Sequence, residues 1–165
     1  MTSRLRPGIL AALVTLALDQ ASKLWLLFGF DLASRGAVKV TPFLDLVLAW
    51  NVGISFGWFQ NDGQFAQIVL MLIKAVAVIV LAIWMAWSRT LIATVALGLI
   101  IGGAIGNAID RLHWPGVMDF ALLYGTFGGD RYDWYVFNLA DAAIVAGVGG
   151  LLYESFLGGA AAKAP

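Results

Sequence analysis

Long apolar stretches alternate with polar ones along this chain. Four of the apolar stretches are long enough to cross the hydrocarbon core of a membrane, which takes about 20 helical residues. They cover residues 8–28, 65–87, 91–109 and 139–157. The pattern therefore predicts an α-helical integral membrane protein with four transmembrane helices.

The connections between these stretches differ in length. Only residues 88–90 separate the second and third stretches, so we expect a tight antiparallel pair of helices there. The connections 29–64 and 110–138 are long, and an even number of spans puts both on one side of the membrane. We expect residues 1–157 to form a single membrane-embedded domain and residues 158–165 to be a disordered tail.

The first long connection contains segments typical of β-strands. Residues 37–41 and 44–50 are rich in β-branched and apolar side chains, and Pro42 lies between them. They predict a small hairpin or sheet on one membrane face. Residues 133–137 could add a strand or serve as an aromatic anchor at the membrane surface.

Small residues recur along the last two apolar stretches. They lie four positions apart, which places them on one face of a helix and lets two backbones approach closely in lipid. The predicted contact residues are Gly98, Gly102 and Gly106 on the third helix and Ala142, Ala146 and Gly150 on the fourth.

Composition supports a membrane protein and excludes several other classes. The chain is 61% hydrophobic and only 12% charged, whereas soluble domains carry about 25% charged residues. The net charge is +0, which gives no support for a nucleic-acid partner. Cysteine is absent, so disulfides, thiolate catalysis and cysteine-ligated metals are excluded.

The basic residues give a weak indication of orientation. Their counts on the two sides of the membrane are equal, so the positive-inside rule does not decide the topology by itself. Arg4 and Arg6 directly precede the first span and favour a cytoplasmic N-terminus. We therefore expect the C-terminal tail in the cytoplasm and both long connections outside.

Three aspartates lie at the outer edge of the predicted bundle. Asp110 ends the third apolar stretch, Asp141 opens the fourth, and Asp119 lies in the connection between them. Ionisable residues at such positions are costly and indicate a functional site. Asn107 and Arg111 share a helix face, and Asn138 with Asp141 resembles a helix capping box.

Paired carboxylates can carry acid–base chemistry. Two carboxylates close together cannot both ionise, so they share one proton. The ionised group can activate water while the protonated group polarises a carbonyl. Asp141 begins a helix, whose dipole favours the anion. The sequence pattern leaves its partner open between Asp110 and Asp119.

Other functions are compatible with single features of the sequence. A serine–lysine hydrolase could use Ser55 and Lys74. A small transporter or channel could use Asp19, Lys23 and Lys74 as a proton path, although the two halves show no repeat. His113 could ligate a metal but has no cysteine or histidine companion in the sequence.

Five segments in order resemble the motifs of the type II signal peptidases, the lipoprotein signal peptidases of bacteria. They are DQASK at 19–23, NVGISFG at 51–57, GNAIDR at 106–111, VMDF at 117–120 and FNLAD at 137–141. Each segment alone is a weak signal. Their order and their positions relative to the predicted spans make the resemblance specific, and it covers nearly the whole chain.

This resemblance implies an activity and a location. The family consists of membrane aspartic endopeptidases that cleave a diacylglyceryl-modified prolipoprotein before its lipidated cysteine. The implied fold has four membrane helices, a small extracytoplasmic β-cradle and cytoplasmic termini in the bacterial inner membrane. The implied partners are the prolipoprotein and membrane lipid; no cofactor, metal or nucleic acid is expected, and the enzyme is expected to be monomeric.

The resemblance also assigns roles to individual residues. It implies that Asp119 and Asp141 form the catalytic dyad. Asp110 is expected to hold Arg111 and the end of the helix. Asp19, Lys23 and Asp110 are all expected to be structural supports. The implied substrate-binding residues are Asn51, Gly53, Asn107, Arg111, Asn138 and Ala140. Lys74 belongs to none of the motifs, and an acid such as Asp19 could pair with it.

Overall fold

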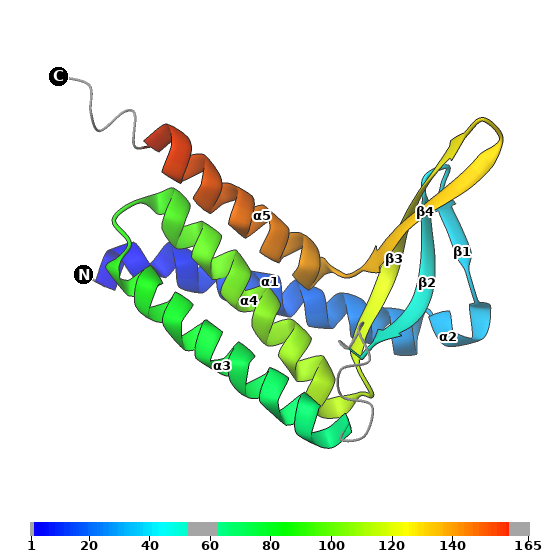
Figure 1. Ribbon diagram of the computed structural model, residues 1–165, viewed down its shortest axis with the longest axis horizontal. Helices are drawn as coiled ribbons and strands as arrows, with labels where there is room; N and C mark the ends of the chain where they lie inside the picture. Colours follow the sequence, from blue (N-terminus) through cyan, green and yellow to red (C-terminus); the bar gives the residue numbers. More distant parts are fainter. Residues whose placement is uncertain (1, 53–62, 159–165) are drawn as a thin grey trace.

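The computed structural model describes residues 2–52 and 63–158, so Gly53, Ser55 and nearly all of the predicted tail lie outside the described residues. A helical bundle lies at one end of the molecule and a sheet at the other (Figure 1). The helices are α1 Thr2–Leu24 with its π-helical extension η1 Trp25–Gly29, α2 Leu32–Arg35, α3 Gly63–Trp87, α4 Leu91–His113 and α5 Leu139–Tyr153 with its extension η2 Glu154–Gly158.

The membrane-spanning prediction is supported in part. Within the described residues, three helical segments are long and apolar enough to cross a membrane: Leu5–Gly29, Leu91–His113 and Leu139–Phe156. The apolar part of α3 found there, Met71–Trp87, is shorter. The span predicted for α3 therefore stays a prediction.

The third helix is longer than the predicted span 91–109. Helix α4 continues to His113, so Asp110 and Arg111 belong to its last turn and not to the connection. The backbone N–H of Trp114 donates to the carbonyl oxygen of Asp110 and ends the helix. The apolar stretch ends at the first polar residues, but the backbone hydrogen bonds of the helix continue through them.

Helix α4 lies between α1 and α5 and approaches both closely. Gly98 and Gly102 lie against backbone carbonyls of α1, and Gly106 lies against the side chain of Asp19, as the small-residue spacing predicted. The face predicted for α5 is wrong in part. Gly147 lies against the carbonyl oxygen of Ala96, whereas Ala142 and Ala146 are exposed.

The sheet has four antiparallel strands in the order β1-β2-β3-β4. They are β1 Val38–Thr41, β2 Leu44–Asn51, β3 Val117–Phe127 and β4 Asp130–Phe137. The sequence analysis missed β3, the longest of them, because its first residues are all buried and show no alternation. The turn before β4 consists of Gly128 and Gly129, whose φ angles of 63° and 95° favour glycine.

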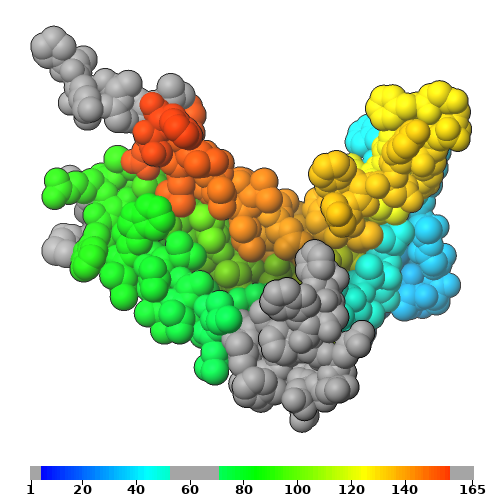
Figure 2. Space-filling view, in the orientation of Figure 1, coloured from blue at the N-terminus to red at the C-terminus, as the bar shows by residue number. Residues whose placement is uncertain are grey.

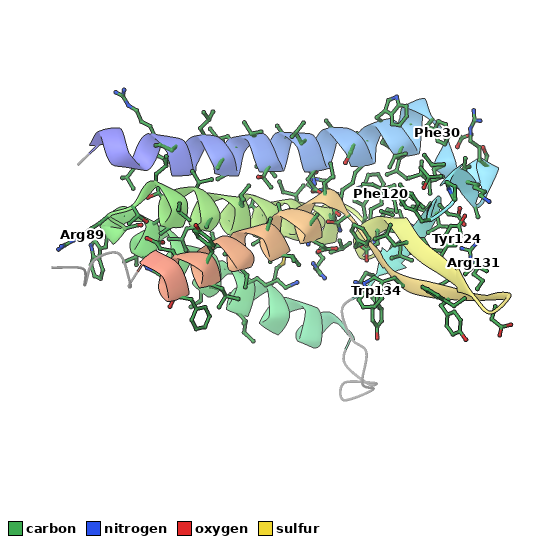
Figure 3. All side chains as sticks on the ribbon, turned by 90° about the horizontal axis from the view of Figure 1, so that it is seen from above. Phe30, Arg89, Phe120, Tyr124, Arg131 and Trp134 are labelled. Carbon is green, nitrogen blue, oxygen red and sulfur yellow. The ribbon has the colours of Figure 1, made fainter. Side chains whose placement is uncertain are left out.

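A small apolar core joins the sheet to the bundle. Leu26 of η1 and Leu32 of α2 pack against Met118 and Phe120 of β3, and all four are buried. Figure 3 shows Phe120 at this junction and Arg89, in the α3–α4 turn, at the opposite end of the molecule. Burial of Met118 and Phe120 fixes the start of β3 against the helices.

The sheet and α5 diverge from their common link. In Figure 1 the β3–β4 hairpin and α5 form the two arms of a V, and the space-filling view in Figure 2 shows that the notch between them stays open. The link at the base of this notch contains Asn138, the N-terminal cap of α5.

Candidate active site

The described members of the predicted site meet where the bundle joins the sheet. Asp119 lies on β3, which corrects its placement in an irregular connection, and Asp141 lies in the first turn of α5. Strand β2 ends at Asn51, opposite Val117 in the sheet. The other predicted residues that reach this junction are Asp19 and Lys23 from α1, Asn107, Asp110 and Arg111 from α4, and Asn138 and Ala140.

Asn138 connects the two candidate catalytic carboxylates. Its Nδ2 donates to Asp119 Oδ1 at 2.7 Å. Its Oδ1 accepts from the backbone N–H of Asp141 at 2.9 Å, and its own N–H donates to Asp141 Oδ2 at 3.3 Å. The predicted capping box is confirmed. Because Asn138 is buried and bonded on both sides, it fixes Asp119 and Asp141 relative to each other.

Asn107 holds the other oxygen of Asp141. Its Nδ2 donates to Asp141 Oδ1 at 2.8 Å, and its Oδ1 accepts from Lys23 Nζ at 3.3 Å and from Asn138 Nδ2 at 3.1 Å. Only the amide oxygen can accept from these two donors, so Lys23 and Asn138 together determine which way the amide of Asn107 points. Both oxygens of Asp141 thus accept hydrogen bonds, one from Asn107 and one from the backbone of Asn138.

Asp119 lies in a different environment. Its side chain is buried, and burial raises the pKa of Asp119 above its ordinary value. Asn51 opposes this shift, because its Nδ2 donates to Asp119 Oδ2 at 3.1 Å and favours the ionised form. The negative charge of Asp141 raises the pKa of Asp119 further, and the hydrogen bond from Asn138 lowers it.

A buried ion cluster lies next to this pair. Lys23 Nζ is 2.7 Å from Asp19 Oδ2 and 2.7 Å from Asp110 Oδ2, and all three side chains are at most 4% exposed. Two expectations are therefore wrong. Asp110 is paired with Lys23, while Arg111 donates through Nη1 to the carbonyl oxygen of Asn107 at 3.0 Å. Asp19 is likewise paired with Lys23 and not with Lys74.

The same cluster holds the backbone beside each candidate catalytic residue. Asp110 Oδ2 accepts from the N–H of Met118 at 3.0 Å, one residue before Asp119. Asp19 Oδ1 accepts from the N–H of Ala140 at 3.0 Å, one residue before Asp141. Since Lys23 joins the two carboxylates, this cluster couples the start of β3 to the start of α5.

One residue of this network, Gln20, was not among the site residues predicted from the sequence. Gln20 donates through Nε2 to Asp110 Oδ1 at 3.0 Å and to the carbonyl oxygen of Gly106 at 3.2 Å. A glutamine inside a transmembrane stretch is itself a signal, because an unpaired amide in lipid is costly. Met118 contributes only its backbone N–H, which no side-chain pattern could indicate.

A protein metal site needs several ligating side chains close together. No group of three or more His, Cys, Asp or Glu side chains suited to holding a metal occurs among them. His113 is exposed, and its Nδ1 lies 3.0 Å from the carbonyl oxygen of Ile109 in the preceding turn.

Comparison with known proteins assigns the chain to a family. The family model described as signal peptidase (SPase) II matches residues 11–157, which is most of the chain. The chain belongs to the signal peptidase II family. Members of this family are aspartic proteases that cleave signal peptides from prolipoproteins, and the transporter alternative is not supported.

Individual relatives of this signal peptidase agree over nearly its full length. The lipoprotein signal peptidase of Nitrobacter hamburgensis is 65% identical over 161 residues, covering 98% of this chain and 98% of the relative. That of Rhodopseudomonas palustris is 62% identical over 160 residues, covering 97% and 98%. That of Methylorubrum extorquens is 50% identical, covering 91% and 85%.

Solved structures resemble the signal peptidase as well. A bacterial membrane enzyme determined by the in meso method at 2.3 Å resolution has a TM-score of 0.73 and 26% identity, over 95% of this chain and 91% of that chain. A second such structure, at 1.9 Å resolution, has a TM-score of 0.71 and 26% identity, over 91% and 92%.

Proposed function

We propose that this chain cleaves a diacylglyceryl-modified prolipoprotein before its lipidated cysteine, with Asp119 and Asp141 as the catalytic dyad. The observation that carries the proposal is the network of Asn107 and Asn138. These two side chains are hydrogen-bonded to each other, and they donate to Asp141 and Asp119 respectively. Aspartic proteases need two carboxylates that share one proton, and this network gives them different environments.

The two environments assign the two roles. Asp141, held by two donors at a helix N-terminus, is the ionised group and takes a proton from water. Asp119, whose pKa is raised by burial, is the protonated group and donates to the oxygen of the scissile carbonyl. The water oxygen bonds to the carbonyl carbon. When the C–N bond breaks, the proton on Asp141 passes to the leaving amine and Asp119 recovers its own.

The remaining polar groups would bind the substrate or support the site. Asn51 and Arg111 approach the dyad from β2 and α4 and can contact the substrate backbone. Asp19, Lys23 and Asp110 would keep the dyad's backbone in place. The residues proposed to bind substrate are Asn51, Gly53, Asn107, Arg111, Asn138 and Ala140.

We also propose a place in the membrane. Helix α3 would complete four spans in the bacterial inner membrane, with a monomeric enzyme and the sheet at the extracytoplasmic face. The support is that Asp119 lies on β3 next to Phe120, and that Figure 3 shows Phe120 and the sheet at the end of the molecule opposite Arg89. The chain has no cysteine, so an impermeant thiol reagent should label Lys39→Cys from outside and not Arg89→Cys. The reverse result would invert this topology.

Removal of the lipid from the precursor is expected to lower kcat/KM by about 100-fold or more. Each methylene buried in the membrane contributes about 0.8 kcal/mol, so two acyl chains hold the cysteine at one depth. Without them the scissile carbonyl is poorly oriented at the dyad, and misplacement by about 1 Å can cost 100-fold. The same precursor is compared with and without its diacylglyceryl group at equal detergent concentration. Equal kcat/KM values would contradict lipid recognition.

Asn51→Ala is expected to move the basic limb of the pH–rate profile to higher pH. The hydrogen bond from Asn51 favours ionised Asp119, so its loss raises the pKa of Asp119 further. Asp119 then keeps its catalytic proton to higher pH. Asn51→Gln retains an amide donor and serves as the control. An unmoved basic limb in Asn51→Ala would show that Asp119 is not the protonated member.

A further inference from the structure

An apolar groove lies between α3 and α4, which run side by side in Figure 1. Its volume is about 380 Å³. Small side chains at Ala75, Ala104 and Ala108 leave the space, and larger ones such as Val78 and Ile105 form its walls. The groove is connected to the candidate active site through Lys74 in its lining, which interacts electrostatically with Arg111 and Asp141.

Lys74 is the one charged residue among those that line this groove. Its side chain is half-buried, and the described part of the chain offers it neither a hydrogen bond nor an ion pair. Among the described residues, Arg111 repels it and Asp141 attracts it. A lone ammonium among apolar side chains of a membrane protein is costly and indicates a function.

The cations around the dyad differ in their partners. Arg111 uses Nη1 on the carbonyl oxygen of Asn107, which leaves further N–H donors on its guanidinium. With one proton on the dyad, Asp119 and Asp141 carry one negative charge together. Arg111 and Lys74 carry two positive charges. The neighbouring cluster of Asp19, Lys23 and Asp110 carries one net negative charge and balances Arg111, so among these described residues Lys74 is the cation that lacks both a hydrogen bond and an ion pair.

Peptide hydrolysis supplies such an anion at this place. Water adds its oxygen to the scissile carbonyl carbon, the C–N bond breaks, and the amine leaves with the lipoprotein. The other product is a carboxylic acid at the new C-terminus of the signal peptide. It loses its proton to solvent near neutral pH. A carboxylate in apolar surroundings needs a cation close by.

We propose that Lys74, assisted by Arg111, binds the new C-terminal carboxylate of the cleaved signal peptide, whose last apolar residues lie in the groove between α3 and α4. The inference rests on the proposed function, because only cleavage beside the dyad creates that carboxylate there. It makes the signal peptide a product inhibitor that is recognised by its charge. Lys74 is then a product-binding residue, outside the acid–base chemistry.

Inhibition by synthetic signal peptides tests this site. Two peptides of identical sequence end at the cleavage site, one as the free acid and the other as the C-terminal amide. Cleavage of lipidated precursor by the purified full chain in micelles is the readout. The free acid is expected to inhibit the wild-type enzyme about tenfold more strongly than the amide, because a charge-assisted hydrogen bond contributes that much.

Variants assign this preference to Lys74. Lys74→Met keeps an unbranched side chain without the charge and should bring the acid-to-amide ratio close to one. Lys74→Arg should keep the preference. Lys39→Met removes an exposed lysine of β1 and should leave both the ratio and the cleavage rate unchanged.

The outcomes separate this inference from the proposed function. If lipidated precursor is cleaved but acid and amide inhibit the wild-type enzyme equally, the inference is overturned and the proposed function stands. A preference that survives in Lys74→Met also overturns it. If diacylglycerol competes with the peptides and the acid shows no advantage, the groove holds an acyl chain instead. Failure to cleave lipidated precursor at all would contradict the proposed function itself.

Discussion

Asp141→Asn is expected to lower cleavage of a lipidated precursor by roughly 1000-fold or more, and Asp119→Asn to do the same. An amide in either position cannot exchange the proton that the dyad must give and take, and general acid–base catalysis contributes about 10²–10⁴ in rate. Asparagine keeps the size of the side chain. The capping interaction of Asn138 with the backbone N–H of residue 141 also remains available.

Cleavage is measured with purified protein in micelles, and thermal unfolding of each variant is measured beside it. Asp130→Asn is the matched control, because Asp130 is exposed at the start of β4, in the hairpin distant from the bundle. It should cleave at the wild-type rate. A folded Asp119→Asn enzyme with near-normal turnover would remove Asp119 from the mechanism and reopen the choice of Asp110.

Lys23→Met is expected to destabilise the protein by about 3–5 kcal/mol, the usual cost of breaking a buried ion pair. The substitution leaves Asp19 and Asp110 buried with no cation between them. It also removes one of the two donors to the oxygen of Asn107, which weakens the hold of that amide on Asp141. Stability is measured by denaturation in detergent, with exposed Lys39→Met as the control, which should cost less than about 0.5 kcal/mol.

A double variant tests whether Asp110 and Lys23 stabilise each other. Adding Asp110→Asn to Lys23→Met restores the net charge of the buried cluster, since one negative and one positive charge have been removed. The two losses should therefore sum to more than the loss in the double variant. Simple additivity would mean that Lys23 and Asp110 do not stabilise each other. Retained activity in a stable Lys23→Met enzyme would contradict its positioning role.

The hydrophobic pattern predicted the helices better than the sheet. Long apolar stretches specify α1, α4 and α5 because a chain in lipid must satisfy its backbone hydrogen bonds within each helix. Strand β3 carries no such signal. Val117 to Phe120 are all buried where β3 pairs with β2 and packs against the helices, so their side chains show no alternation. Asp119 consequently looked like part of a connection, although it lies in the sheet.

The candidate site shows the same division. The capping box of Asn138 and Asp141 depends on residues three positions apart, so local sequence predicted it. The pairing of Asp110 did not follow from its neighbours. Arg111 is adjacent in sequence, but consecutive residues of a helix point in different directions, and Lys23 reaches Asp110 from α1. The packing face of α5 likewise depended on how α5 lies against α4.

The sequence by itself determined that this chain is a membrane protein of the signal peptidase II family, which residues carry its charges inside apolar stretches, and where α5 is capped. These features depend on composition, on motifs and on contacts within one helical turn. Only the tertiary structure decided that Asp119 and Asp141 meet through Asn138, that Lys23 joins Asp19 to Asp110, and that Lys74 lines a groove between α3 and α4. Those contacts join residues from different helices and strands, and their geometry is set by close packing of α4 against its neighbours, which no local pattern encodes.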